Sequence, residues 1–88
     1  MLSYCVIALH LGCWIVTEDV RANEGLFSLR TGLTPQECQA ECLSSSLCKA
    51  FNWWPDATAR NCELSSSTSV TTVKSGMVIH YELTACER

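Results

Sequence analysis

Seven cysteines in a chain of 88 residues constrain the fold of this protein more than any other feature of its sequence. A chain of this length forms one small domain. Its hydrophobic core is too small to offset comfortably the backbone entropy lost on folding, which costs about 1–2 kcal/mol per residue. Short secreted chains rich in cysteine solve this problem with disulfide bonds. The sequence therefore predicts a single disulfide-stabilised domain from an oxidising compartment.

Length and charge exclude several classes of protein. There is no room for a dinucleotide-binding domain, a barrel enzyme or a kinase, and no apolar run reaches the ~18 residues that a membrane span requires. Six Lys and Arg residues stand against nine Asp and Glu, and no two of the basic residues are adjacent. Nucleic-acid binding needs a basic stripe, so we expect neither a nucleic-acid partner nor a membrane span in the mature chain.

The first 16 residues, MLSYCVIALHLGCWIV, are largely apolar, as in the apolar region of a secretory signal peptide. Two positions are possible for the boundary between this leader and the mature domain. Cleavage after Ala22 would follow the small-residue pattern of Val20 and Ala22, but it would remove Cys13 and leave an odd number of cysteines. Alternatively, residues 1–12 form the leader and Cys13 begins the first strand of the domain.

The clearest local signal is Thr34-Pro-Gln-Glu37. Thr34 is a favourable N-cap, Pro35 suits the first helical position, and Glu37 completes a capping box three residues after the cap. We expect a helix from Pro35 to about Leu43, ended by three serines. This explains Glu37 as a structural residue, and no pair of carboxylates is placed for acid–base catalysis.

Short β-prone runs surround this helix. They comprise 13–17, 26–29, 48–54, 61–64, a weak run at 70–73, and an alternating run at 77–83. Runs 48–54 and 61–64 should form a hairpin, and Gly25 a turn. The order of strands, one helix and strands predicts an α+β fold with an antiparallel sheet. In the last run we expect His80 to be exposed, on the face opposite Ile79 and Tyr81.

The cysteine spacing limits the pairing without determining it. Cys38 and Cys42 share one face of the expected helix, Cys48 is close enough for a tight bridge to Cys42, and Cys62 is within reach of Cys38. Six cysteines nevertheless allow 15 pairings. Gaps of five and thirteen residues fit no common zinc framework, and no histidine is placed to activate a thiol. We therefore expect no metal, no cofactor and no catalytic residue.

The pattern Cys38-x3-Cys42-x5-Cys48-x2-Phe51-x-Trp53, followed by Cys62-x-Leu64, resembles the core of a PAN/apple domain. The resemblance extends over residues 13–86. It implies the bridges Cys13–Cys86, Cys38–Cys62 and Cys42–Cys48, and one helix cradled by a curved antiparallel sheet. It also places Cys13 inside the domain, so that residues 1–12 are an apolar leader or truncated signal peptide and 87–88 a short tail. Cys5 then lies in the leader.

The same resemblance implies a secreted, extracellular recognition module without catalysis of its own. Its ligand would be a carbohydrate, as in lectin-like adhesion; the alternative is protein docking within a multi-module adhesin or protease precursor. Since the family pattern assigns Phe51 and Trp53 to the core, Trp54 points outward, either as a platform for a sugar ring or partner or as a cap on the hairpin. The polar residues near it that could bind sugar hydroxyls are Lys49, Asn52, Asp56 and Arg60.

Overall fold

The computed structural model describes residues 3–8, 10–55, 60–73 and 78–86, with Arg60 described by its backbone alone. One helix and eight strands follow in the order β1 (Ser3–Ala8), β2 (Gly12–Glu18), β3 (Val20–Ala22), β4 (Leu26–Thr31), α1 (Pro35–Leu43), β5 (Ala50–Trp53), β6 (Arg60–Ser65), β7 (Val70–Thr72) and β8 (Ile79–Thr84). The helix has the predicted bounds, and the run at 61–64 extends by one residue at each end to form β6.

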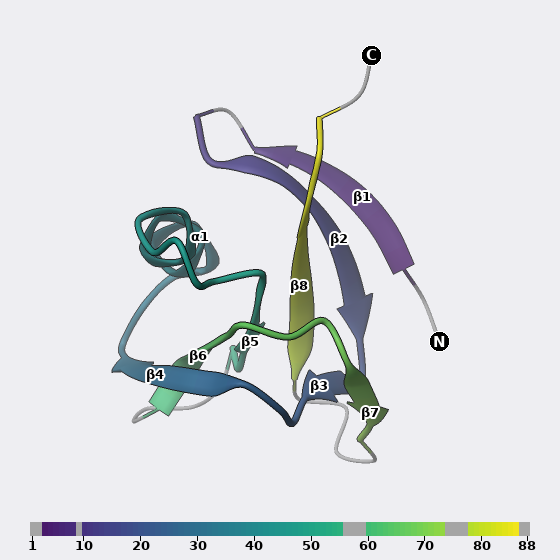
Figure 1. The fold of residues 1–88 in the computed structure, drawn as a ribbon. Coiled ribbons are helices and arrows are strands. Elements are labelled where there is room, and N and C mark those ends of the chain that lie inside the picture. Colours follow the sequence, from purple (N-terminus) through teal and green to yellow (C-terminus); the bar gives the residue numbers. More distant parts are fainter. Residues whose placement is uncertain (1–2, 9, 56–59, 74–77, 87–88) are drawn as a thin grey trace.

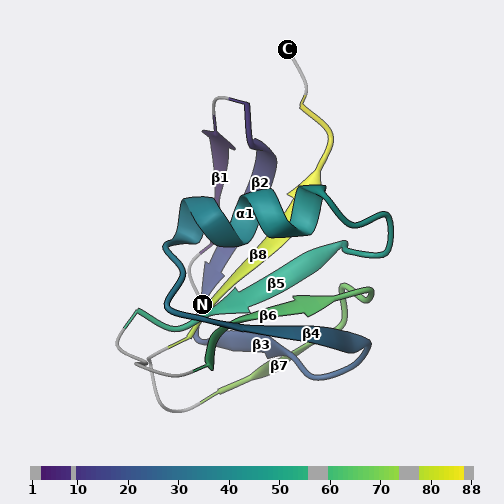
Figure 2. The same ribbon diagram turned by 90° about the vertical axis from the view of Figure 1, so that its left-hand side faces the viewer.

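A curved six-stranded sheet carries the fold. Its strand order is β1-β2-β8-β5-β6-β4, and all neighbouring strands are antiparallel. Helix α1 lies on the concave side of this sheet (Figures 1 and 2). A short ribbon of β3 and β7 forms a second sheet, and β3 packs against β5 and β8. The fold is thus the small disulfide-rich α+β fold that the sequence predicts.

The capping residues act as the sequence indicates. The Thr34 side chain accepts a hydrogen bond from the Glu37 backbone N–H at 3.1 Å, and the Glu37 carboxylate accepts one from the Thr34 N–H at 2.8 Å. Two of the otherwise unpaired N–H groups at the helix start are thereby satisfied. The helix therefore begins at Pro35 because of interactions within four residues of sequence.

Aromatic side chains fill the space between helix and sheet. Phe51 stacks on Tyr81 with ring centroids 4.5 Å apart, and Trp14 meets the edge of Phe51 at 5.2 Å. Val16, Leu64 and four half-cystines complete the buried cluster. Trp53 packs at its margin, where its Nε1 donates a hydrogen bond to the Leu33 carbonyl at 2.9 Å.

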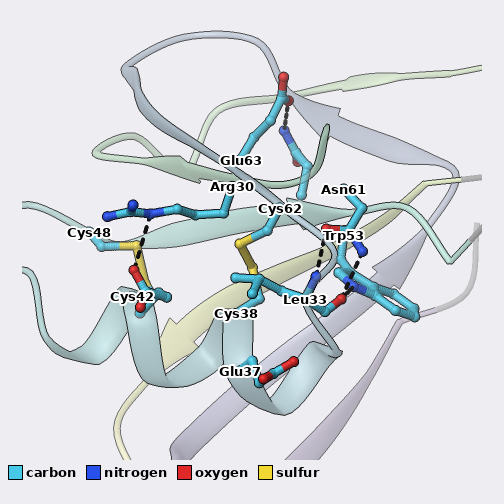
Figure 3. The surroundings of a disulfide bond; sticks show 12 residues. Arg30, Leu33, Glu37, Cys38, Cys42, Cys48, Trp53, Asn61, Cys62 and Glu63 are labelled. Carbon is cyan, nitrogen blue, oxygen red and sulfur yellow. Dashed lines mark hydrogen bonds and ion pairs between the residues drawn. A yellow bond between two sulfur atoms is a disulfide. The ribbon is translucent and has the colours of Figure 1, made fainter. Parts of the chain in front are cut away.

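Three disulfides cross-link these elements in the pairing that the family resemblance implies. Cys38–Cys62 joins α1 to β6, Cys42–Cys48 closes the turn after α1, and Cys13–Cys86 joins β2 to the segment after β8 (Figure 3 shows the first two). Cys5 is the remaining free cysteine and is exposed. The bridges therefore hold together residues 13–86 and leave β1 outside the cross-linked framework.

Three features of the fold differ from expectation or add to it. Residues 3–8, which we expected in a leader, form β1 and pair with β2 from Ser3↔Thr17 to Ala8↔Gly12. Strand β3 has no counterpart among the expected runs. His80 is 2% exposed, so the prediction that it is exposed is wrong. Its face of β8 is covered because β3 packs there.

Candidate binding surface

Trp54 lies directly after β5, at the hairpin end where the sequence left open a binding platform or a cap on the hairpin. Its backbone N–H donates to the Asn61 carbonyl at 3.0 Å, which closes the base of the hairpin. The side chain is half-buried, and the Arg21 guanidinium carbon lies 5.4 Å from the centroid of its ring. This cation–π contact orients the indole and joins β3 to the hairpin.

Glu63 fixes the orientation of Arg21. The Arg21 Nη2 atom donates to both carboxylate oxygens of Glu63, at 3.1 and 3.0 Å, and Nε donates to one of them at 3.2 Å. The Glu63 side chain is 10% exposed and that of Arg21 is 40% exposed. A bidentate pair of this kind is stronger and more directional than a single contact between charges. The guanidinium is therefore held between the indole and the carboxylate.

Asn52 is the centre of a buried polar network. Its Oδ1 atom accepts from the Ala22 N–H at 2.8 Å, and its Nδ2 atom donates to the Ala22 carbonyl at 2.9 Å and to Glu63 at 3.1 Å. The residue is fully buried. We expected it to contact a ligand, but its amide is occupied inside the protein. Its role is to attach β3 to β5, and so to place Arg21.

His80 extends this network to β8. Its Nδ1 atom lies 3.0 Å from Asn52 Oδ1, and burial lowers the pKa of its imidazole to about 4. In register, Thr17, His80, Asn52 and Glu63 face one another across four adjacent strands. This row of polar residues lies on the face opposite Phe51 and the helix, which explains why β3 must supply hydrogen-bonding groups to cover it.

Beside Glu63, strand β4 presents an apolar surface. Leu26, Phe27 and Leu29 are 37%, 39% and 47% exposed, although each is large and hydrophobic. Together with Ser28 and Glu63 they line a hollow of about 400 Å³. Leu29 lies directly opposite Glu63 in the β4–β6 register. We call Leu26, Phe27, Leu29, Glu63, Arg21 and Trp54 the β4 surface, since Glu63 is shared by the hollow and the Arg21–Trp54 pair.

Of the remaining predicted contact residues, Lys49 does not join this surface. Lys49 is exposed but precedes β5, five residues from Trp54, which is roughly 17 Å along an extended strand. Its backbone is used within the sheet, where its N–H donates to Ser65 and its carbonyl accepts from Leu83. Asp56 and the side chain of Arg60 lie outside the described residues. Of the three predicted residues whose side chains the structure describes, Trp54, Asn52 and Lys49, only Trp54 lies on the β4 surface.

Sequence reasoning missed Arg21, Glu63 and the apolar side chains of β4. Arg21 and Glu63 are 42 positions apart, so no local pattern connects them. The available signal was weak: Glu63 stands between the apolar residues Cys62 and Leu64, and alternation along a strand would place such a residue on an exposed face.

The described part of the chain contains neither a cluster of metal-ligating side chains nor a membrane-spanning helix. Among its residues, no three His, Cys, Asp or Glu side chains are grouped so as to hold a metal ion. Its helix, α1, is nine residues long and too short to cross a bilayer.

Comparison with known families agrees with this architecture. Residues 13–86 match the PAN domain, a span that includes all six half-cystines. No curated protein and no solved structure matched the chain. PAN domains are binding modules for proteins or carbohydrates, and disulfide-rich folds of this kind are typical of extracellular domains. With its family match, its three bridges and its single helix on a curved sheet, the chain belongs to the PAN domain family.

Proposed function

We propose that this PAN domain is an extracellular recognition module that binds a protein partner through the β4 surface. The observation that carries this proposal is the exposure of Leu26, Phe27 and Leu29 side by side along a hollow. Large apolar side chains grouped in this way mark interaction sites more often than scattered ones do. Arginine and tryptophan, here Arg21 and Trp54, are the residue types that most often dominate binding energy at interfaces.

The scaffold favours binding without a large ordering cost. The Glu63 and Asn52 network holds Arg21 in place, and Cys38–Cys62 ties the strand that carries Glu63 to the helix. A surface ordered before it meets its partner loses less entropy on binding. The mechanism is therefore recognition by a rigid, preformed surface.

A carbohydrate ligand is the second candidate, and it depends on Trp54. An indole held by Arg21, with guanidinium N–H groups beside it, offers a stacking face and hydrogen-bond donors to a sugar. Against this, Asn52 is buried and Lys49 lies at the other end of β5. Neither of these two expected polar residues is available beside Trp54, so the protein ligand is better supported.

The two candidates are separated by testing the oxidised full chain on an array of recombinant extracellular proteins and on a glycan array. We expect a partner on the protein array whose binding is lost in Leu29→Ser and Phe27→Ser. Leu47→Ser is the matched control, since Leu47 is 61% exposed and follows α1, and it does not line the hollow beside β4. The opposite result is a chain that binds glycans and no protein, with binding lost in Trp54→Ala and retained in Leu29→Ser. That result would show that the ligand is a carbohydrate and not a protein. A protein partner that tolerates both β4 variants would contradict the proposed surface.

A further inference from the structure

We infer that the outer edge of β2 is an acceptor site for an extended, uncharged peptide strand, and that residues 3–8 occupy this site in the present chain. The inference concerns the opposite end of the sheet from β4 and does not depend on the partner proposed above. Its starting point is that β1 lies outside the matched PAN domain, which begins at Cys13, but pairs along its whole length with β2.

Strand β1 is an added edge strand that lies outside the cross-linked domain. No disulfide attaches it to the rest of the protein, and it is one of the two edge strands of the six-stranded sheet, at the end opposite β4 (Figure 1). Its six residues run antiparallel to β2. An added strand of this kind gains affinity from main-chain hydrogen bonds and specificity from alternate side chains. Without β1, the outward N–H and C=O groups of β2 form an open edge.

The side chains of β1 define the chemistry that the site accepts. Val6 and Ala8 are half-buried and pack against the aromatic core, and Val6 lies opposite Trp14. Ile7, between them, points the other way and is 76% exposed. None of the six residues is charged. An occupant therefore needs small or branched apolar residues at the positions of Val6 and Ala8, and can vary at that of Ile7.

A polar contact sets the register at the other end of the strand. The Ser3 hydroxyl lies 2.8 Å from the hydroxyl of Thr17, which is itself buried. A shift by one residue would move Val6 and Ala8 off the core face and break this contact. The occupant is thus an antiparallel strand with a hydroxyl near its start and apolar residues toward its end.

Removal of residues 1–12, as expected for a leader, would vacate this edge. Cys13–Cys86 and the other two bridges would remain, since all six half-cystines lie between 13 and 86. The structure assigns the vacated site to a segment of another chain with the chemistry of β1. The inference therefore gives a PAN domain of this type a second binding site, distinct from the β4 surface.

The test uses the full chain with Cys5→Ser and a fluorescent peptide of residues 2–9 carrying the same substitution. Val6→Asp in the chain places a charge against the core and displaces β1, whereas Ile7→Asp places the charge in solvent. We expect saturable binding of the peptide to the Val6→Asp chain by fluorescence anisotropy. The Ile7→Asp chain and the parent should not bind it, because β1 fills the site. A peptide with its own Val6→Asp should bind about tenfold more weakly or worse, and one with Ile7→Asp nearly normally.

A second arrangement covers the case in which the Val6→Asp chain does not fold. A protease site inserted in the β1–β2 turn allows the folded parent chain to be cut, so that β1 becomes a separate peptide that labelled peptide can replace. Exchange that depends on Val6 supports the inference. A folded protein that takes up no peptide after cutting, or that binds both aspartate peptides equally, would overturn it.

Discussion

The Nδ1 atom of His80 lies 3.0 Å from Oδ1 of Asn52, on strands whose register places the two residues directly opposite each other. The Asn52 amide nitrogen donates to two acceptors, so Oδ1 must be an acceptor, and the neutral imidazole carries its proton on Nδ1. Nε2 is buried and has no hydrogen-bond partner among the described residues. Protonation of Nε2 would therefore place an unpaired charge inside the protein.

This arrangement predicts an acid-sensitive stability. Burial lowers the pKa of His80 from 6.5 to about 4, so between these values the unfolded chain binds a proton that the native state does not. With respect to His80, the free energy of unfolding is therefore highest above pH 6.5. It decreases as the pH falls toward 4, by at most about 1.4 kcal/mol per pH unit. Urea unfolding across this range should show the loss in the parent and a flatter profile in His80→Gln.

The matched control for this experiment is His10→Asn. His10 is exposed and has a φ of 64°, a backbone conformation that asparagine tolerates. We expect this variant to keep the parent profile between pH 4 and 6.5. Equal slopes in the parent and in His80→Gln would show that His80 is not the group responsible.

The two ion pairs of the described structure should contribute very differently to stability. Arg21→Met leaves the nearly buried Glu63 carboxylate without its bidentate partner, and should lower the free energy of unfolding by about 2 kcal/mol. Arg30→Met breaks the Arg30–Glu41 pair, whose side chains are 54% and 42% exposed, and should change it by less than about 0.5 kcal/mol. Similar losses in both variants, measured by urea unfolding, would contradict the structural role of the Arg21–Glu63 pair.

The disulfides should differ in their contribution to the free energy of unfolding, according to the length of the loop that each closes. Cys38–Cys62 spans 24 residues and Cys42–Cys48 spans six, so chain entropy predicts losses of about 3 and about 2 kcal/mol when each pair is replaced by alanine. Burial of Cys38 and Cys62 adds to the first loss, since their removal leaves space in the core. Denaturant unfolding of the two double variants should follow this order, and the reverse order would argue against the loop-entropy explanation.

The mature N-terminus can be read by mass spectrometry of protein secreted from eukaryotic cells. We predict that processing, where it occurs, retains Cys13, because β2 pairs with β8 in the sheet and Cys13 is bridged to Cys86. A product that begins at Asn23 would lack β2 and leave Cys86 without its partner. Finding that product as the folded, secreted form would show that the boundary at residue 13 is wrong.

Much of the architecture could be predicted because its causes are local. Thr34, Pro35 and Glu37 start the helix through contacts within one turn, and its predicted bounds are confirmed. The hairpin of β5 and β6 was likewise expected from two β-prone runs separated by a turn. The candidate site was much less predictable, since Asn52 and Trp54 are close in sequence but one is buried and the other lies at the surface.

The sequence by itself determined the small disulfide-stabilised domain, its single helix and its resemblance to PAN domains. Cysteine spacing, capping residues and strand alternation are all readable over short stretches of chain. Only the tertiary structure decided that β3 covers His80 and Asn52, and that Arg21 meets Glu63 and Trp54. Alternation along β8 separates two faces but does not reveal whether another segment buries the second one. That depends on packing between residues that are distant in the chain, and on the hydrogen bonds that buried polar groups require.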